Sequence, residues 1–113
     1  MRRGEVWWAD LPPPSGRRPV VLLSRDESYT MRSLVTVAPV TTRIRAIPVE
    51  VLLGPDDGLP RVCAANLDII TIIGQARLRQ RVTMLSPEKL RAIDNAIHIA
   101  LGLDDDGHSG RTI

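Results

Sequence analysis

The spacing of apolar residues along this chain changes from a strand-like to a helical pattern at Ser86. This change constrains the fold more than any single motif. After it, apolar residues recur at helical spacing from Leu90 to Leu101. Before it, short β-prone segments are separated by Pro, Gly and Asp, and we predict strands over Glu5–Asp10, Pro19–Ser24, Leu34–Val40, Pro48–Leu53, Arg61–Ala65, Ile69–Ile73 and Arg77–Met84. The pattern predicts a mainly β fold, a strongly bent sheet or barrel, with a C-terminal α-helix packed against it.

The predicted helix carries sequence signals at both ends. Ser86 is placed to cap its N-terminus, Pro87 suits the first helical position, and Glu88 lies in the first turn. Gly102 follows the last periodic residue and is expected to end the helix. We therefore expect one domain over residues 1–103, with the acidic segment 104–113 as a polar tail without fixed structure.

Composition indicates the cellular compartment of the protein and the type of its hydrophobic core. Of the residues, 43% are hydrophobic but only 3% are aromatic, and Phe is missing, so the core must be aliphatic. The apolar runs are too short for a membrane span or a signal peptide. A single cysteine, Cys63, leaves no internal disulfide and predicts a small buried thiol. We expect a cytoplasmic protein.

Two tryptophans, Trp7 and Trp8, are neighbours on the first predicted strand. Successive strand residues face opposite sides of a sheet, so both cannot enter one core. We expect one to pack inside the barrel and the other to lie at its surface.

The basic residues are almost all arginines: of fifteen, only Lys89 is a lysine. A planar guanidinium grips phosphate or carboxylate through two parallel hydrogen bonds, which favours such partners. A general preference for arginine codons would give the same composition, so composition alone leaves both readings open.

Polar groups gather at the ends of two predicted strands. Arg17 and Arg18 precede the apolar run that begins at Pro19, whereas Thr41, Thr42, Arg43 and Arg45 follow the strand that ends at Val40. If the two ends meet, they form a small rigid anion site that fits a phosphodiester. Arg77, Arg79 and Arg81 form a second basic row, which reads more readily as a solvated strand face than as a catalytic one.

Other chemistries find little support in the pattern. We find no Gly-rich phosphate loop, no Cys/His cluster with metal spacing and no paired carboxylates. His98 shares the outward helix face with Arg91 and Asp94, which argues against a nuclease with two catalytic histidines. An arginine and a hydroxyl can still stabilise a pentacoordinate phosphorane, and RNA supplies its own 2′-hydroxyl nucleophile. The residue pattern alone indicates a small basic β-rich domain and leaves nucleic-acid binding open.

The order of several segments resembles the MazF/PemK toxin family over residues 2–103. The matching segments are Arg2–Leu11, Gly16–Val21, Leu23–Asp26, Val37–Ile44, Pro48–Val51, Gly58–Pro60, Asn66–Ile69 and Leu85–Glu88. The resemblance implies an SH3-like barrel of the CcdB/MazF type, a homodimer and a cognate MazE-like antitoxin. It also implies cleavage of single-stranded RNA, with no metal or cofactor, to 2′,3′-cyclic phosphate and 5′-hydroxyl ends.

Site residues follow from the resemblance by position. It implies that Arg18 and Thr41 form the catalytic pair, with Arg18 neutralising the phosphate and transferring a proton and Thr41 hydrogen-bonding a non-bridging oxygen. Substrate contacts are expected from Ser15, Gly16, Arg17, Thr42, Arg43, Arg45, Asn66 and Asp68.

One segment departs from the family pattern. The first loop is shortened to Pro12–Gly16, and this loop helps to gate the RNA groove in the family.

Two other functions stay open beside the toxin ribonuclease: a CcdB-like gyrase poison and a non-catalytic SH3-like RNA-binding module.

Overall fold

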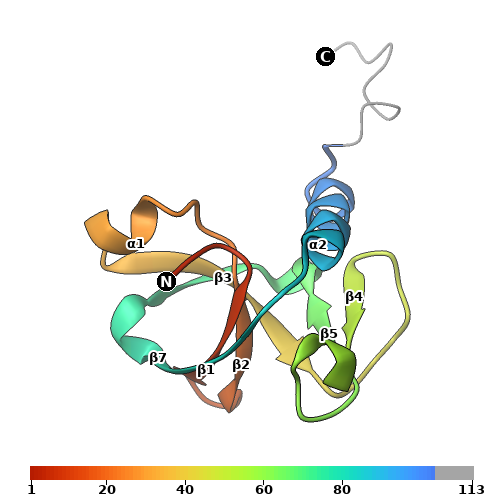
Figure 1. The fold of residues 1–113 in the computed structure, drawn as a ribbon, viewed down its shortest axis with the longest axis horizontal. Helices are drawn as coiled ribbons and strands as arrows, with labels where there is room; N and C mark the ends of the chain where they lie inside the picture. The colour runs from red at the N-terminus through yellow and green to blue at the C-terminus, as the bar shows by residue number, and fades with distance from the viewer. Residues whose placement is uncertain (104–113) are drawn as a thin grey trace.

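The structure, a computed structural model, describes residues 1–103, and they form one bent antiparallel sheet with a C-terminal helix (Figure 1). The elements are β1 Glu5–Leu11, β2 Gly16–Leu22, α1 Ser28–Met31, β3 Leu34–Thr41, β4 Glu50–Leu53, β5 Cys63–Asn66, β6 Thr71–Gly74, β7 Leu78–Met84 and α2 Pro87–Ala100. Three short 3-10 turns lie between the later strands: η1 Pro55–Asp57, η2 Leu67–Ile69 and η3 Gln75–Arg77. The predicted fold class, mainly β with a C-terminal helix, is confirmed.

Strand β3 is shared by both halves of the sheet. The strand order is β4-β5-β3-β2-β1-β7, with β6 paired to β3 as well. Leu34–Val37 pair with β6, whereas Val40 and Thr41 pair with β5. The C-terminal end of β3 is thereby fixed between β5 and the strand pair β1–β2.

The core lies on both faces of the central strands. Val20, Val21 and Leu22 are all fully buried, as the continuous apolar run predicted. Alternate residues enter different clusters: Val21 packs with Val6, Val40 and Ile93 of α2, whereas Val20 and Leu22 pack with Tyr29 of α1 and its neighbours. A strand covered on both faces needs no polar alternation, which explains the sequence of β2.

Helix α2 begins and ends where the sequence signals place it. The Ser86 hydroxyl accepts a hydrogen bond of 3.1 Å from the Lys89 N–H, and Pro87 occupies the first position. Gly102 follows with a φ of +68°, a conformation that favours glycine. Ile93 and Ala96 are buried against the sheet, but Leu101 is exposed because it lies beyond the end of the helix.

The arginine row of β7 does not form one regular strand face. Arg77 lies in η3 before the strand, and the pairing of β7 with β1 shifts register twice. Arg79 instead pairs with Asp10 and Arg81 with Glu5, both on β1. The row is therefore largely neutralised by carboxylates, in keeping with a solvated face.

Within residues 1–103, no helix has both the length and the apolar character needed to cross a membrane. The predicted polar tail, 104–113, lies outside the described residues.

Candidate functional site

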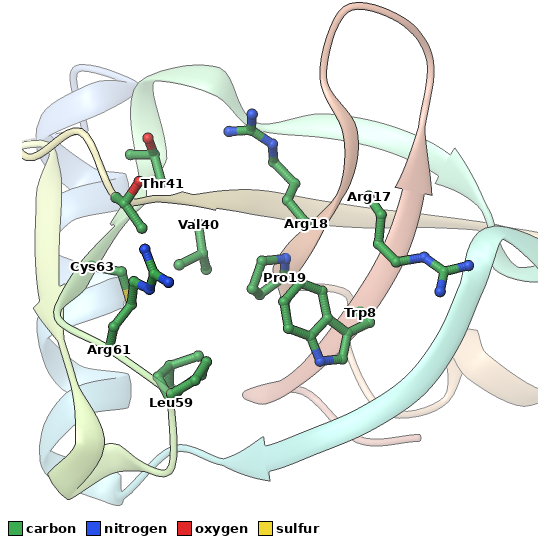
Figure 2. A pocket seen from close by; sticks show the side chains of 11 residues that line it. Trp8, Arg17, Arg18, Pro19, Val40, Thr41, Leu59, Arg61 and Cys63 are labelled. Carbon is green, nitrogen blue, oxygen red and sulfur yellow. The ribbon is translucent and has the colours of Figure 1, made fainter.

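Arg18 of β2 and Thr41 of β3 line two cavities, and they are the two residues that appear in the walls of both. The first cavity, about 330 Å³, is lined by Trp8, Arg17, Arg18, Pro19, Val40, Thr41, Thr42, Leu59, Pro60, Arg61 and Cys63 (Figure 2). The second, about 240 Å³, is lined by Arg18, Pro39, Thr41, Arg43, Arg45, Glu50, Asn66 and Ile69. The strand ends that the sequence marked as polar do meet in space.

Arg18 is held inside β2 rather than ahead of it. The strand begins at Gly16, so Arg18 pairs with Ala9 of β1 and is half-buried. Its Nε is buried and has no hydrogen-bond partner, and it forms no ion pair within the described part of the chain. Figure 2 shows its guanidinium extending toward the Thr41 side of the cavity. A positive group of this kind is ready to bind an anion.

Thr41 is the last residue of β3 and pairs with Ala64 of β5. Its Oγ1 accepts a hydrogen bond of 3.1 Å from the Arg43 N–H. The hydroxyl donates no hydrogen bond within residues 1–103, so its proton is available for a ligand oxygen.

Carboxylates divide the predicted cationic residues into two groups. Arg17 pairs with Asp10 at 2.8 Å, and its side chain turns away from Arg18 toward β7 (Figure 2). Arg45 pairs with Glu50 at 3.2 Å. Across residues 1–103, no carboxylate forms an ion pair with Arg18, Arg43 or Arg61. These three are the arginines around the cavities that retain a free charge.

Asp10 and Glu50 stay ionised because of their arginine partners. Hydrogen bonds from Arg17 and Arg79 lower the pKa of Asp10 to about 2. Burial acts to raise the pKa of Glu50, but hydrogen bonds from the backbone and side chain of Arg45 outweigh it, and the pKa is lowered. Both carboxylates therefore neutralise arginines throughout the neutral range.

Glu50 also fixes the loop between β3 and β4. Its carboxylate accepts hydrogen bonds from the Arg45 N–H at 2.9 Å and the Ala46 N–H at 3.1 Å. Ala46 has a φ of +53°, which is uncommon for a residue with a Cβ, so these bonds hold a costly backbone turn. The loop carries Arg43 to the wall of the second cavity.

The other predicted substrate contacts lie in different settings. Thr42 lines the first cavity, and Asn66 lines the second with its side chain accepting from the Asp68 N–H at 2.9 Å. Ser15 and Gly16 lie at the exposed end of the β1–β2 hairpin, and Asp68 is exposed within η2; none of the three lines either cavity. Their contacts with substrate stay predictions.

Sequence reasoning missed one wall of the first cavity. Trp8, Leu59, Pro60 and Arg61 come from β1 and from the segment between η1 and β5, and only the strand pairing brings them to Arg18. Cys63 is buried as predicted, and burial raises the pKa of its thiol, but it also lines this cavity. Among residues 1–103, no group of three or more His, Cys, Asp or Glu is arranged to hold a metal ion.

Comparison with known proteins places this geometry in a family. Residues 2–101 match the model of the PemK-like, MazF-like toxins of type II toxin–antitoxin systems. Over 100 residues the chain is 43% identical to "Probable endoribonuclease MazF5" of Mycobacterium tuberculosis, covering 88% of this chain and 91% of that protein. It is 36% identical over 111 residues to endoribonuclease MazF of Staphylococcus saprophyticus, covering 91% and 92%.

A solved structure agrees with these sequences. An endoribonuclease from Mycobacterial species, in complex with its cognate antitoxin, superposes with a TM-score of 0.81 at 30% identity, covering 92% of this chain and 97% of that one. The matches run through β1, β2, β3 and α2, the elements that build and support the two cavities. The chain belongs to the PemK-like, MazF-like toxin family of type II toxin–antitoxin systems.

Proposed function

We propose that this toxin is an endoribonuclease that cleaves single-stranded RNA without a metal ion, using Arg18 and Thr41 as its catalytic pair. The observation that carries the proposal is that both residues line both cavities, so a phosphate between them leaves room for a nucleotide on either side. The relatives named as endoribonucleases support the same activity.

The reaction follows from the chemistry of RNA. The 2′-hydroxyl attacks the neighbouring phosphorus and loses its proton, a P–O2′ bond forms, and the P–O5′ bond breaks as O5′ takes up a proton. The products are a 2′,3′-cyclic phosphate and a 5′-hydroxyl. The extra negative charge of the pentacoordinate intermediate falls on the non-bridging oxygens, where preorganised donors have most effect.

Arg18 and Thr41 supply such donors. The half-buried guanidinium neutralises the phosphate, and the Thr41 hydroxyl, whose oxygen accepts from the Arg43 N–H and whose proton has no acceptor among residues 1–103, donates to a non-bridging oxygen. An ionised guanidinium donates a proton poorly and accepts none, so the main role of Arg18 is electrostatic. Arg61 adds positive charge to the first cavity and Arg43 to the second, on either side of this phosphate.

We place the toxin in the cytoplasm, as a homodimer whose activity a cognate MazE-like antitoxin restrains by covering the RNA site. The related endoribonuclease structure that contains a cognate antitoxin supports this partner. An exposed apolar face supports the homodimer: Leu34 and Ile72 are 59% and 63% exposed, and the pairing of β3 with β6 puts them on one side of the sheet.

Purified protein and single-stranded RNA in EDTA provide the test. We expect cleavage that leaves 5′ ends ready for phosphorylation by a kinase and 3′ ends closed as cyclic phosphates. Arg18→Ala and Thr41→Ala should each lower the rate on the order of 10²–10³-fold. Arg18→Lys should recover little, since an ammonium cannot reproduce the guanidinium fork.

Matched surface variants control for folding and general charge. Arg25 pairs with Glu27 and Thr30 is exposed, so Arg25→Ala and Thr30→Ala should cleave at the wild-type rate. Wild-type rates in either Arg18→Ala or Thr41→Ala would remove that residue from the site. Binding without cleavage would indicate an RNA-binding module, and gyrase inhibition without either would indicate a CcdB-like poison.

A further inference from the structure

Trp8 is the one aromatic side chain of the described residues that enters neither core cluster. The chain has only two tryptophans, one tyrosine and no phenylalanine. Tyr29 belongs to the cluster that contains Val20 and Leu22, and Trp7 packs against the same cluster. Trp8 is half-buried on the other side of β1, where it lines the first cavity beside Pro19.

The adjacent Trp7 shows what a structural tryptophan does in this fold. Its indole N–H donates to the Glu5 carboxylate at 2.8 Å while its ring covers the core. Trp8 makes no such contribution to either core, so the stability of the fold does not explain a large aromatic ring at this position.

The cavity around Trp8 suits a flat aromatic ligand. Figure 2 shows Trp8 on the side of β1 and β2 and Arg61 entering from the facing side, with Leu59 below Arg61. Val40 and Leu59 give the wall an apolar surface, whereas Arg18 and Arg61 carry the charge. An indole face and a guanidinium plane are both groups on which nucleobases stack in single-stranded complexes.

We infer that the first cavity holds one nucleobase of the substrate RNA, stacked on Trp8 and flanked by the Arg61 guanidinium, next to the phosphate bound by Arg18. The inference rests on the proposed function for the identity of the substrate. It adds a specificity-determining residue, Trp8, and a subsite that reads the shape and stacking strength of one base. A cavity of about 330 Å³ leaves room for a purine or a pyrimidine with its sugar.

The two tryptophans permit a test at a single position. Trp7→Phe leaves Trp8 as the sole tryptophan, and Trp8→Phe leaves Trp7 as the matched control on the opposite face of β1. The probes are 2′-O-methyl hexanucleotides of each of the four bases, which lack the nucleophile and cannot be cleaved, together with an abasic hexamer of equal charge. Thermal melting confirms that both variants are folded.

Base-bearing hexamers should quench Trp8 fluorescence in Trp7→Phe, and the abasic hexamer should not. Trp7 fluorescence in Trp8→Phe should change little on addition of either. Trp8→Ala should lower kcat/KM for RNA cleavage about tenfold to a hundredfold, the range for loss of one stacked base, while Trp8→Phe should keep most of the activity.

Each result separates the stacking subsite from the catalytic proposal. Three results would overturn the subsite even if RNA is cleaved. The abasic hexamer could quench Trp8 as much as the base-bearing hexamers do, Trp7 could respond to the hexamers as much as Trp8 does, or the quenching of Trp8 could be independent of the bases. If the wild-type protein leaves RNA intact in EDTA while base-dependent quenching of Trp8 is present, the subsite stands and the proposed reaction fails.

Discussion

At the scale of single residues, the arginines of this toxin differ by what faces them rather than by type. Arg17 and Arg79 share the Asp10 carboxylate, whereas Arg18, within the same hairpin as Arg17, has no acidic partner among the described residues. The sequence marked all three as basic. It could not separate them, because the pairing depends on strands that are 69 residues apart in the case of Asp10 and Arg79.

Asp10→Asn tests this division of charge. Removing the carboxylate frees Arg17 and Arg79 for phosphate contacts, so RNA should bind more tightly at low salt. The slope of log affinity against log salt should steepen by about 0.7 for each additional phosphate neutralised. Fluorescence anisotropy with an uncleavable oligonucleotide measures both. An unchanged slope would show that RNA does not pass over the β1–β2 hairpin.

The same carboxylate predicts how acid affects stability. The pKa of Asp10 falls from 3.8 to about 2 in the folded protein, chiefly through the hydrogen bonds from Arg17 and Arg79. Between these values the unfolded chain binds more protons, so the free energy of unfolding falls as the pH falls. The Tm of the wild type should exceed that of Asp10→Asn at pH 7, and the difference should shrink between about pH 4 and pH 2. A constant difference would contradict the assignment.

At the scale of elements, the loop from β3 to β4 depends on one side chain. Glu50 accepts two backbone hydrogen bonds from Arg45 and Ala46 and one from the Arg45 side chain. Its side chain is 3% exposed, so water replaces these bonds poorly once they are lost.

Glu50→Ala should therefore release this loop while leaving the sheet intact. Amide hydrogen exchange over residues 42–49 should quicken about tenfold or more, and exchange in β1 and β2 should stay unchanged. Because the loop positions Arg43, the KM for RNA should rise more than kcat falls. Arg25→Ala is the matched control, since Arg25 pairs with Glu27 on a distant exposed segment. Slow exchange in the variant loop would show that other contacts hold it.

The order and type of the elements were predictable, and their ends less so. Strand β2 starts at Gly16 rather than Pro19, because Leu11 and Gly16 pair across a hairpin. The prolines of the loop gave no sequence signal of this pairing. Strand β7 loses its regular alternation because β1 shifts register against it at Val6/Trp7 and Trp8/Ala9. Apolar periodicity marks which segments are strands, but register shifts and hairpin closure depend on the neighbouring strand.

The lining of the two cavities followed the same rule. As lining residues, Arg18 and Thr41 were predictable from strand ends and from the family resemblance, and the structure brings them together. Trp8 and Arg61 were not, since each looks ordinary in its own segment and gains its setting only when β1, β2 and β5 are assembled.

At the scale of the whole molecule, the two cavities share one property: each is lined by arginines that form no ion pair within residues 1–103. Arg18, Arg43 and Arg61 line the two cavities, whereas Arg91 lies on the exposed face of α2. An acidic antitoxin segment and RNA would use the same surface, and both attractions weaken as salt rises.

Charge reversal at Arg43 should weaken both partners together. Arg43→Glu should lower the affinity for an uncleavable oligonucleotide and for an acidic antitoxin peptide, with the larger effect at low salt. Arg91→Glu makes the same change of charge on α2 and should leave both affinities nearly unchanged. Tight RNA binding by Arg43→Glu at low salt would place the RNA groove on another face of the toxin.

Cys63 gives this cavity a chemical reporter. It is the only thiol in the chain, it is 3% exposed, and burial raises its pKa, so an alkylating reagent reaches it slowly and through the space beside Arg61 and Thr41. The rate of alkylation of the Cys63 sulfur therefore reports whether a ligand occupies the cavity. Oligonucleotide or antitoxin can be followed by the protection it gives, with no cysteine engineered into the toxin.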